Sequence, residues 1–149
     1  MTRLAPAAHG ARLALFIGAA AVVGACGSQS PLVQPAGDHL AAGTWGGDSS
    51  AVIVGDSSAH VVIGCTYGDM IGRVPLDSTG RFAASGSYLL RAFPVAMLPT
   101  MPAQFAGHVS AGSLVLTVTV NDTVAHSTTV RGPVTSVFGR TPNTVVCPI

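Results

Sequence analysis

The stretch "LVLTVTV", residues Leu114 to Val120, decides the fold class because its side chains alternate in character. Leucine or valine occupies every even position, which puts four apolar side chains on one face: Leu114, Leu116, Val118 and Val120. The odd positions hold Val115, Thr117 and Thr119. A repeat of two residues is typical of a half-buried antiparallel strand, with one face on a core and the other in solvent.

Similar strand signals continue on both sides of this stretch. The segment from Phe82 to Arg91 places Phe82 and Tyr88 on one face, and "AVIVGDSSAHVVIGC" holds two apolar runs joined at "GDSS". Shorter strands are expected at 44–47, 73–76 and 144–147, and turns at 77–80, 111–112 and 121–122. The sequence therefore predicts about eight or nine strands, with no helix after the first 25 residues.

Sequential hairpins favour an all-β fold, a small antiparallel up-and-down β-barrel of about eight strands, which closes to remove its edges. A β-sandwich is the alternative. An immunoglobulin-type sandwich has a tryptophan between its two cysteines, whereas Trp45 precedes both Cys65 and Cys147.

The composition is that of one globular domain. The chain has 149 residues, of which 48% are hydrophobic and 9% charged, which excludes a disordered chain. The net charge of +1 includes no basic block, so we expect no nucleic-acid partner.

The first 25 residues have the features of an export signal with a helical apolar segment. Arg3 and Arg12 supply positive charge, and thirteen mostly apolar residues follow at 13–25. This apolar segment is shorter than the roughly 20 residues that span a bilayer. A membrane anchor helix and a signal cleaved to release a soluble protein are the alternatives.

The residues Val23-Gly24-Ala25-Cys26 resemble the lipobox of bacterial lipoproteins. The resemblance implies cleavage before Cys26, a diacylglyceryl group on its sulfur, and acylation of the new amino terminus with chains such as palmitate. Two or more acyl chains make a stable membrane anchor. Gly27 stands where many lipoproteins of the inner membrane carry aspartate. We therefore expect a lipid-anchored protein of the bacterial cell envelope, on the periplasmic face of the outer membrane or on the cell surface, with the choice of membrane left open.

The predicted domain organisation has three parts. A lipoprotein signal peptide covers residues 1–25, a flexible tether covers 26–43, and a β-barrel domain covers 44–149. The tether contains two prolines and no strand alternation, and a flexible chain of its length spans on the order of 20–25 Å.

Several motifs together resemble an uncharacterised family of small bacterial lipoproteins. They are "GTWGGD", "DSTGRF" with a following "GSY", "FAGHVSAGSLVLTVTVND" and a terminal "VVC", and they cover Gly43 to Cys147. The resemblance implies fold and location but no activity. Gly43-Thr44-Trp45 is also similar to the opening of lipocalins and avidins, whose barrels hold small ligands.

The two remaining cysteines, Cys65 and Cys147, are expected to form a disulfide in an exported chain. Closing a loop of roughly 80 residues would stabilise the fold by about 4 kcal/mol. A metal pair or a nucleophile is the alternative, but no third ligand stands at zinc spacing.

Catalytic and cofactor motifs are sparse. The mature histidines His39, His60, His108 and His126 are interpreted as surface or tether residues. The chain has no G-x-S-x-G, no glutamate and no phosphate-binding loop, and most of its aspartates fall in predicted turns. We therefore predict a protein that is not an enzyme and uses no cofactor or metal.

Two functional hypotheses remain. In the first, Trp45, Phe82 and Tyr88 line a barrel that binds a small apolar ligand or an envelope component. The apolar segment "FPVAMLPTMPAQF", Phe93 to Phe105, would add Met97, Leu98 and Met101 to that surface.

In the second hypothesis, the protein is a structural lipoprotein that docks another envelope protein. The three aromatic residues would then fill the core. For the segment at 93–105, the alternative to a surface that binds a partner or an acyl chain is a cap over the open end of the barrel. Its prolines Pro94, Pro99 and Pro102 argue against a central strand or an ordinary helix there.

Overall fold

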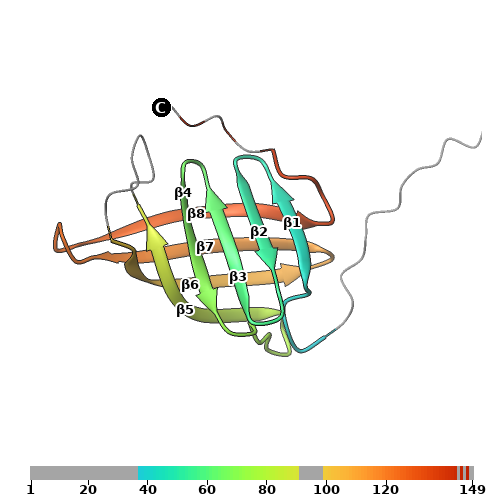
Figure 1. Ribbon diagram of the computed structural model, residues 1–149. Coiled ribbons are helices and arrows are strands. Elements are labelled where there is room, and N and C mark those ends of the chain that lie inside the picture. Colours follow the sequence, from blue (N-terminus) through green and yellow to red (C-terminus); the bar gives the residue numbers. More distant parts are fainter. Residues whose placement is uncertain (1–36, 91–98, 144, 146, 148–149) are drawn as a thin grey trace, which may run out of the picture.

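The computed structural model describes residues 37–90 and 99–143, together with Val145 and Cys147. Its described part is a closed antiparallel barrel in which each strand pairs with the next and the last pairs with the first (Figure 1). The strands are β1 (Gly43–Gly47), β2 (Ser50–Val54), β3 (Ser58–Ile63), β4 (Thr66–Ile71), β5 (Arg81–Leu89), β6 (Met101–Ser110), β7 (Ser113–Asp122) and β8 (Ser127–Phe138). The predicted all-β barrel is confirmed, and the sandwich alternative is not. The predicted signal peptide, Cys26 and most of the tether lie outside the described residues.

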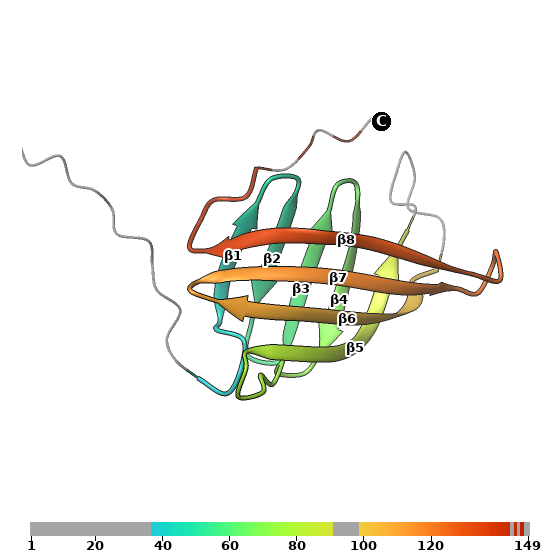
Figure 2. The same cartoon turned by 180° about the vertical axis from the view of Figure 1, so that it is seen from behind.

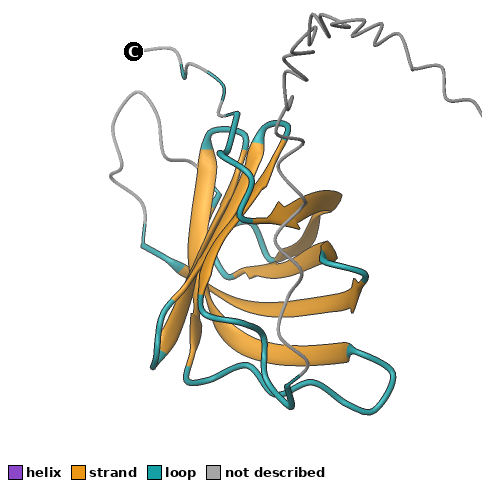
Figure 3. Ribbon diagram, turned by 90° about the vertical axis from the view of Figure 1, so that its right-hand side faces the viewer, coloured by secondary structure: helices purple, strands orange, loops and turns teal. Residues whose placement is uncertain are grey.

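The two halves of the barrel cross at a large angle. Strands β1–β4 run steeply across one side, whereas β6–β8 run nearly horizontally behind them (Figures 1 and 2). Seen from the side, the described chain consists of strands joined by loops (Figure 3). We call the two barrel ends the Leu40 end, with the connections at 55–57, 72–80 and 111–112, and the Cys65 end, with those at 48–49, 64–65 and 123–126.

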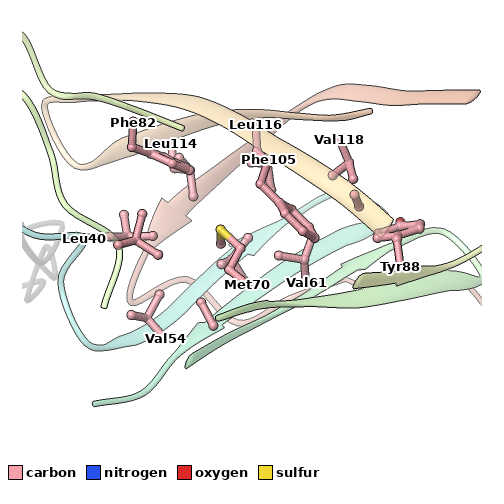
Figure 4. Close-up of a cluster of buried hydrophobic side chains, with 14 of the residues drawn as sticks. Leu40, Val54, Val61, Met70, Phe82, Tyr88, Phe105, Leu114, Leu116 and Val118 are labelled. Atoms are coloured by element: carbon pink, nitrogen blue, oxygen red, sulfur yellow. The ribbon is translucent and has the colours of Figure 1, made fainter. Parts of the chain in front are cut away.

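The core is formed by hydrophobic side chains on the inner faces of the strands (Figure 4). On β7 the four even-numbered apolar side chains are buried, while Val115 on the other face is exposed, so the predicted alternation is confirmed. The largest side chains without access to solvent include Trp45, Tyr88, Phe105 and Met70.

Large aromatic rings lie over glycines of the neighbouring strand. Tyr88 on β5 pairs directly with Gly68 on β4, and Phe82 pairs with Gly107 on β6. A Cβ atom on either glycine would overlap the aromatic ring opposite. These strands therefore fit together because glycine leaves room for the ring.

The end of the predicted tether belongs to the folded domain. Leu40 is 4% exposed and lies in the core cluster at the barrel end named after it. Its amide donates to the carbonyl of Val74 at 2.9 Å, and the amide of Leu76 donates to the carbonyl of Asp38 at 2.7 Å. Burial of one leucine and these backbone bonds explain why a segment without strand alternation is held against the barrel.

Two predictions, a strand before β5 and the position of the turn after β7, were wrong. The segment 73–76 forms only an isolated bridge, between Pro75 and His39, because Pro75 has no amide donor for a ladder. The turn predicted at 121–122 lies at 123–126 instead. There the carboxylate of Asp122 accepts hydrogen bonds from the amides of Val124 and Ala125, which closes the turn after the strand ends.

The exclusion of a central strand from the segment 93–105 was also wrong at its C-terminal end. Strand β6 begins at Met101, and Pro102 pairs with Ser87 of β5. Pairing with β7 starts only at Ala103, so Pro102 sits at the start of the strand, where a missing donor is tolerated. Phe105 is fully buried in the core.

Candidate functional site

Four of the six residues predicted to bind a ligand lie in the core. Trp45 and Tyr88 have no solvent-accessible surface, and Phe82 and Met101 are buried. A side chain without accessible surface borders no space that could admit a water molecule, so Trp45 and Tyr88 pack as core residues. Met97 and Leu98 lie outside the described residues.

Trp45 has specific partners near the Leu40 end. Its ring packs edge-on against Phe138 of β8, with centroids 5.0 Å apart and planes at 62°. Its indole nitrogen donates to the carbonyl of Ala41 at 3.2 Å. The indole therefore ties the incoming chain to the seam between β1 and β8, where the barrel closes.

The predicted disulfide between Cys65 and Cys147 is present, with the Cα atoms 5.5 Å apart. It holds the C-terminal segment at the turn between β3 and β4. Before reaching this turn the segment contacts the β1–β2 connection. There the backbone amide of Ser49 donates to the carbonyl of Asn143 at 2.7 Å, and Arg140 Nη2 pairs with Asp48 Oδ1 at 2.6 Å. The described residues after β8, 139–143 with Val145 and Cys147, thus form a strap from the Leu40 end to the Cys65 end. The strand predicted at 144–147 falls partly outside the described residues.

The four described histidines, His39, His60, His108 and His126, are partly or fully exposed, and those side chains do not form a catalytic arrangement. His60 Nδ1 lies 2.8 Å from Asp69 Oδ1 across strands β3 and β4, and both side chains are substantially exposed. Ser87 of β5 pairs with Asp69 from the opposite side, so the histidine does not stand between the serine and the aspartate. A nucleophile, base and orienting acid need that order.

No group of three or more histidine, cysteine or acidic side chains that could hold a metal ion occurs among the described residues.

An open depression of about 520 Å³ lies between the β4–β5 connection and the start of β5, lined partly by Leu76, Asp77 and Phe82. The carboxylate of Asp77 already accepts hydrogen bonds from the amides of Arg81 and Thr79 and from the Thr79 hydroxyl. These bonds, with that from Arg81 the strongest influence, hold the pKa of Asp77 below its ordinary value. Asp77 therefore acts as a turn residue, as its place in the sequence predicts.

A chain of hydroxyl groups lies on the inner side of the Cys65 end. Thr66 Oγ1 donates to the carbonyl of Ile63 at 2.7 Å, so its own oxygen accepts from the hydroxyl of Tyr88 at 2.8 Å. Burial raises the pKa of Tyr88, while its hydrogen bond with Thr66 and the charge of Arg131 act in the opposite direction.

Arg131 is the candidate site residue that the sequence analysis missed. It pairs with Val118, whose side chain faces the core, and its Nε atom is buried without a hydrogen-bond partner among the described residues. The sequence contains one signal for it: Gly132-Pro133 interrupts the strand pattern of "STTVRGPVTSVF". A glycine inside a strand often marks a bulge, which changes the direction in which neighbouring side chains point.

Comparisons with protein-family models, with curated proteins and with solved structures found no match to this chain. Within residues 37–90 and 99–143, no helix is long and apolar enough to cross a membrane.

Proposed function

We propose that this protein is a lipid-anchored, non-enzymatic binding module of the bacterial cell envelope. We further propose that it binds a small ligand or an envelope component at the Cys65 end of its barrel. The lipobox-like sequence ending at Cys26 supports the anchor, and the disulfide is consistent with an oxidising compartment outside the cytoplasm.

The position of Leu40 is the observation that supports the assignment of the binding site to the Cys65 end. Because Leu40 and the bonds around it hold the incoming chain at one end of the barrel, an anchor at Cys26 would connect to that end. The opposite end, with the turns at 48–49, 64–65 and 123–126, would then point away from the attachment point. The β7–β8 hairpin projects beyond the barrel wall there (Figure 2).

Docking of another envelope protein is the second candidate, favoured by the closed packing around Trp45 and Tyr88. A barrel whose core is filled in this way offers its outer surface instead. Ile71, which is 79% exposed, and Ile53 are apolar side chains on the outer surface towards the Leu40 end. Ile71 therefore provides a test position at the opposite end of the barrel from the exposed Val124.

The anchor is tested by replacing Cys26 with serine and feeding cells labelled palmitate. The unchanged protein should incorporate label and fractionate with membranes, whereas Cys26→Ser should remain a larger, unlabelled precursor. Undiminished labelling of the variant would refute lipidation at this residue.

The binding face is tested with two matched substitutions at exposed apolar residues. Val124→Asp alters the Cys65 end and Ile71→Asp the Leu40 end. Native mass spectrometry of protein extracted from its own envelope should detect a bound ligand in Ile71→Asp but not in Val124→Asp. The reverse result would support docking through the outer surface near Ile71 and refute the assigned end.

A further inference from the structure

The pairing between β7 and β8 contains an irregularity beside Arg131. Leu116 pairs with Val134, but Val118 pairs with Arg131, so Gly132 and Pro133 together lie opposite Thr117. This is a β-bulge, with one extra residue on β8. Because side chains alternate along a strand, one extra residue reverses which side chains of the following stretch face the core.

The reversal places a charged side chain where an apolar one would otherwise be. With regular pairing, Val134, Gly132 and Val130 would share the inner face. With the bulge, Arg131 shares the inner face with the fully buried Val118, and Val130 is 57% exposed. Turning a valine to solvent and an arginine towards the core opposes the hydrophobic effect.

The bulge depends on Gly132. Its φ of +97° is one that side chains other than glycine's rarely adopt, and a Cβ atom there would lie 2.7 Å from the carbonyl oxygen of Leu116. Bulges that redirect a side chain are common beside binding sites. The bulge that turns Arg131 inward therefore requires glycine at position 132.

Arg131 lacks a partner for a buried donor. The residue is partly buried, and its Nε atom has no hydrogen-bond partner among the described residues. A buried donor left unpaired destabilises a fold, and for a charged group the cost is larger. The charge of Arg131 influences the hydroxyl of Tyr88. That hydroxyl is hydrogen-bonded to the hydroxyl of Thr66.

We propose that Arg131 binds the carboxylate of a small ligand on the inner side of β8, towards the Cys65 end. This proposal rests on the proposed function and adds the ligand class to it. A guanidinium group presents its donors in a planar fork that matches the two oxygens of a carboxylate, and Nε is one of those donors. A single arginine also balances the charge of a monoanion, whereas a phosphate dianion would require a second cation.

The test observes the Nε–H group directly by NMR. The acylated mature chain, which begins at Cys26, is labelled with ¹⁵N and held in neutral maltoside micelles. It is titrated with sodium acetate, with sodium chloride at equal ionic strength as the control. The Arg131 Nε–H signal should move downfield and reach saturation with acetate. The signals of Arg81 and Arg140, which lie on the exposed surface, should not saturate.

Arg131→Lys keeps the charge but removes the fork, so it should weaken acetate binding at least about tenfold, measured through the amide signals of β7 and β8. Arg81→Lys is the matched control and should leave binding unchanged. Comparison of melting temperatures checks that Arg131→Lys is folded. Should that variant fail to fold, the Nε–H titration of the unchanged protein still decides the question.

Three results would overturn the proposal. The Arg131 signal could respond to acetate no differently from chloride, Arg131→Lys could bind acetate as well as the unchanged protein, or inorganic phosphate could saturate the signal where acetate does not. A palmitoylated protein that fails to bind acetate refutes this proposal and leaves the anchor standing. An unlabelled protein that binds acetate refutes the anchor and leaves the carboxylate site standing.

Discussion

The backbone carbonyl of Arg140 lies against the Cα atom of Gly46, although the two residues are far apart in the sequence. A Cβ atom at Gly46 would overlap that carbonyl and would also lie 2.7 Å from the nitrogen of Pro142. The second glycine of the "GTWGG" motif thus has a packing role: it lets the C-terminal strap cross β1 closely enough to reach the disulfide at Cys65.

Gly46→Ala should therefore destabilise the protein by about 2 kcal/mol or more, because the atoms in the way belong to backbone and cannot rotate aside. Urea unfolding measures the loss. Gly55→Ala is the control, since its new methyl group would meet nothing closer than 3.5 Å, and it should change stability by less than about 0.5 kcal/mol. Equal effects of the two substitutions would contradict this account.

Leu40→Ala should cost about 2–5 kcal/mol, as truncation of a buried leucine does, because Leu40 packs in the core cluster. Thermal unfolding is the measurement. Ala42→Ser changes an exposed neighbour and serves as the control. An unchanged melting temperature for Leu40→Ala would show that residues 38–41 are part of the flexible tether and do not belong to the folded domain.

Trp45→Ala should cost about 3–5 kcal/mol because it removes a fully buried ring that contacts Phe138. Trp45→Phe keeps an aromatic ring but loses the hydrogen bond to Ala41, so its cost should be smaller. Chemical denaturation monitored by circular dichroism compares the two. Wild-type stability in Trp45→Ala would show that the ring is not part of the core.

Neither Cys65 nor Cys147 should react with iodoacetamide in the unfolded, non-reduced protein. Replacing both with serine should lower stability by up to about 4 kcal/mol, because the bond closes a separation of 82 residues. Mass spectrometry of alkylated peptides reports the thiols, and urea unfolding reports the stability. Two alkylated sites without reduction would rule out the bond.

Stability should fall as the pH rises above the ordinary tyrosine pKa of about 10, in part because of Tyr88. Burial raises the pKa of Tyr88, so the unfolded chain loses this proton at a lower pH than the folded chain does. The contribution is complete below the unfolded pKa and is lost as the pH rises through the folded one. Tyr88→Phe should show a shallower alkaline loss in unfolding experiments. Parallel pH profiles for the two proteins would argue against a raised pKa.

Local patterns in the sequence predicted much of the fold. Alternation in 114–120 identified a half-buried strand, and "DSTG" identified the turn before β5, where Asp77 accepts hydrogen bonds from residues two and four positions later. These features involve neighbours along the chain, so composition and spacing reveal them. The disulfide was predictable for a different reason, because Cys65 and Cys147 are the two cysteines that remain after the lipobox.

The strand boundaries depended on contacts that local patterns do not contain. Strand β4, "TYGDMI", has no clear apolar alternation. Its buried Gly68 has no side chain, which leaves room for the Tyr88 ring of the neighbouring strand. Likewise, Pro102 is accommodated in β6 because β7 does not pair with it.

What the sequence by itself determined is the class of fold, the number of strands to within one, and the pairing of the two cysteines. The tertiary structure alone decided that Leu40 closes one end, that Gly46 lies beneath Arg140, and that the bulge at Gly132 turns Arg131 inward. The physical reason is the range of the interactions. Alternation and turn chemistry act between near neighbours, whereas a steric contact or a pairing register joins segments whose proximity exists only once the barrel has closed.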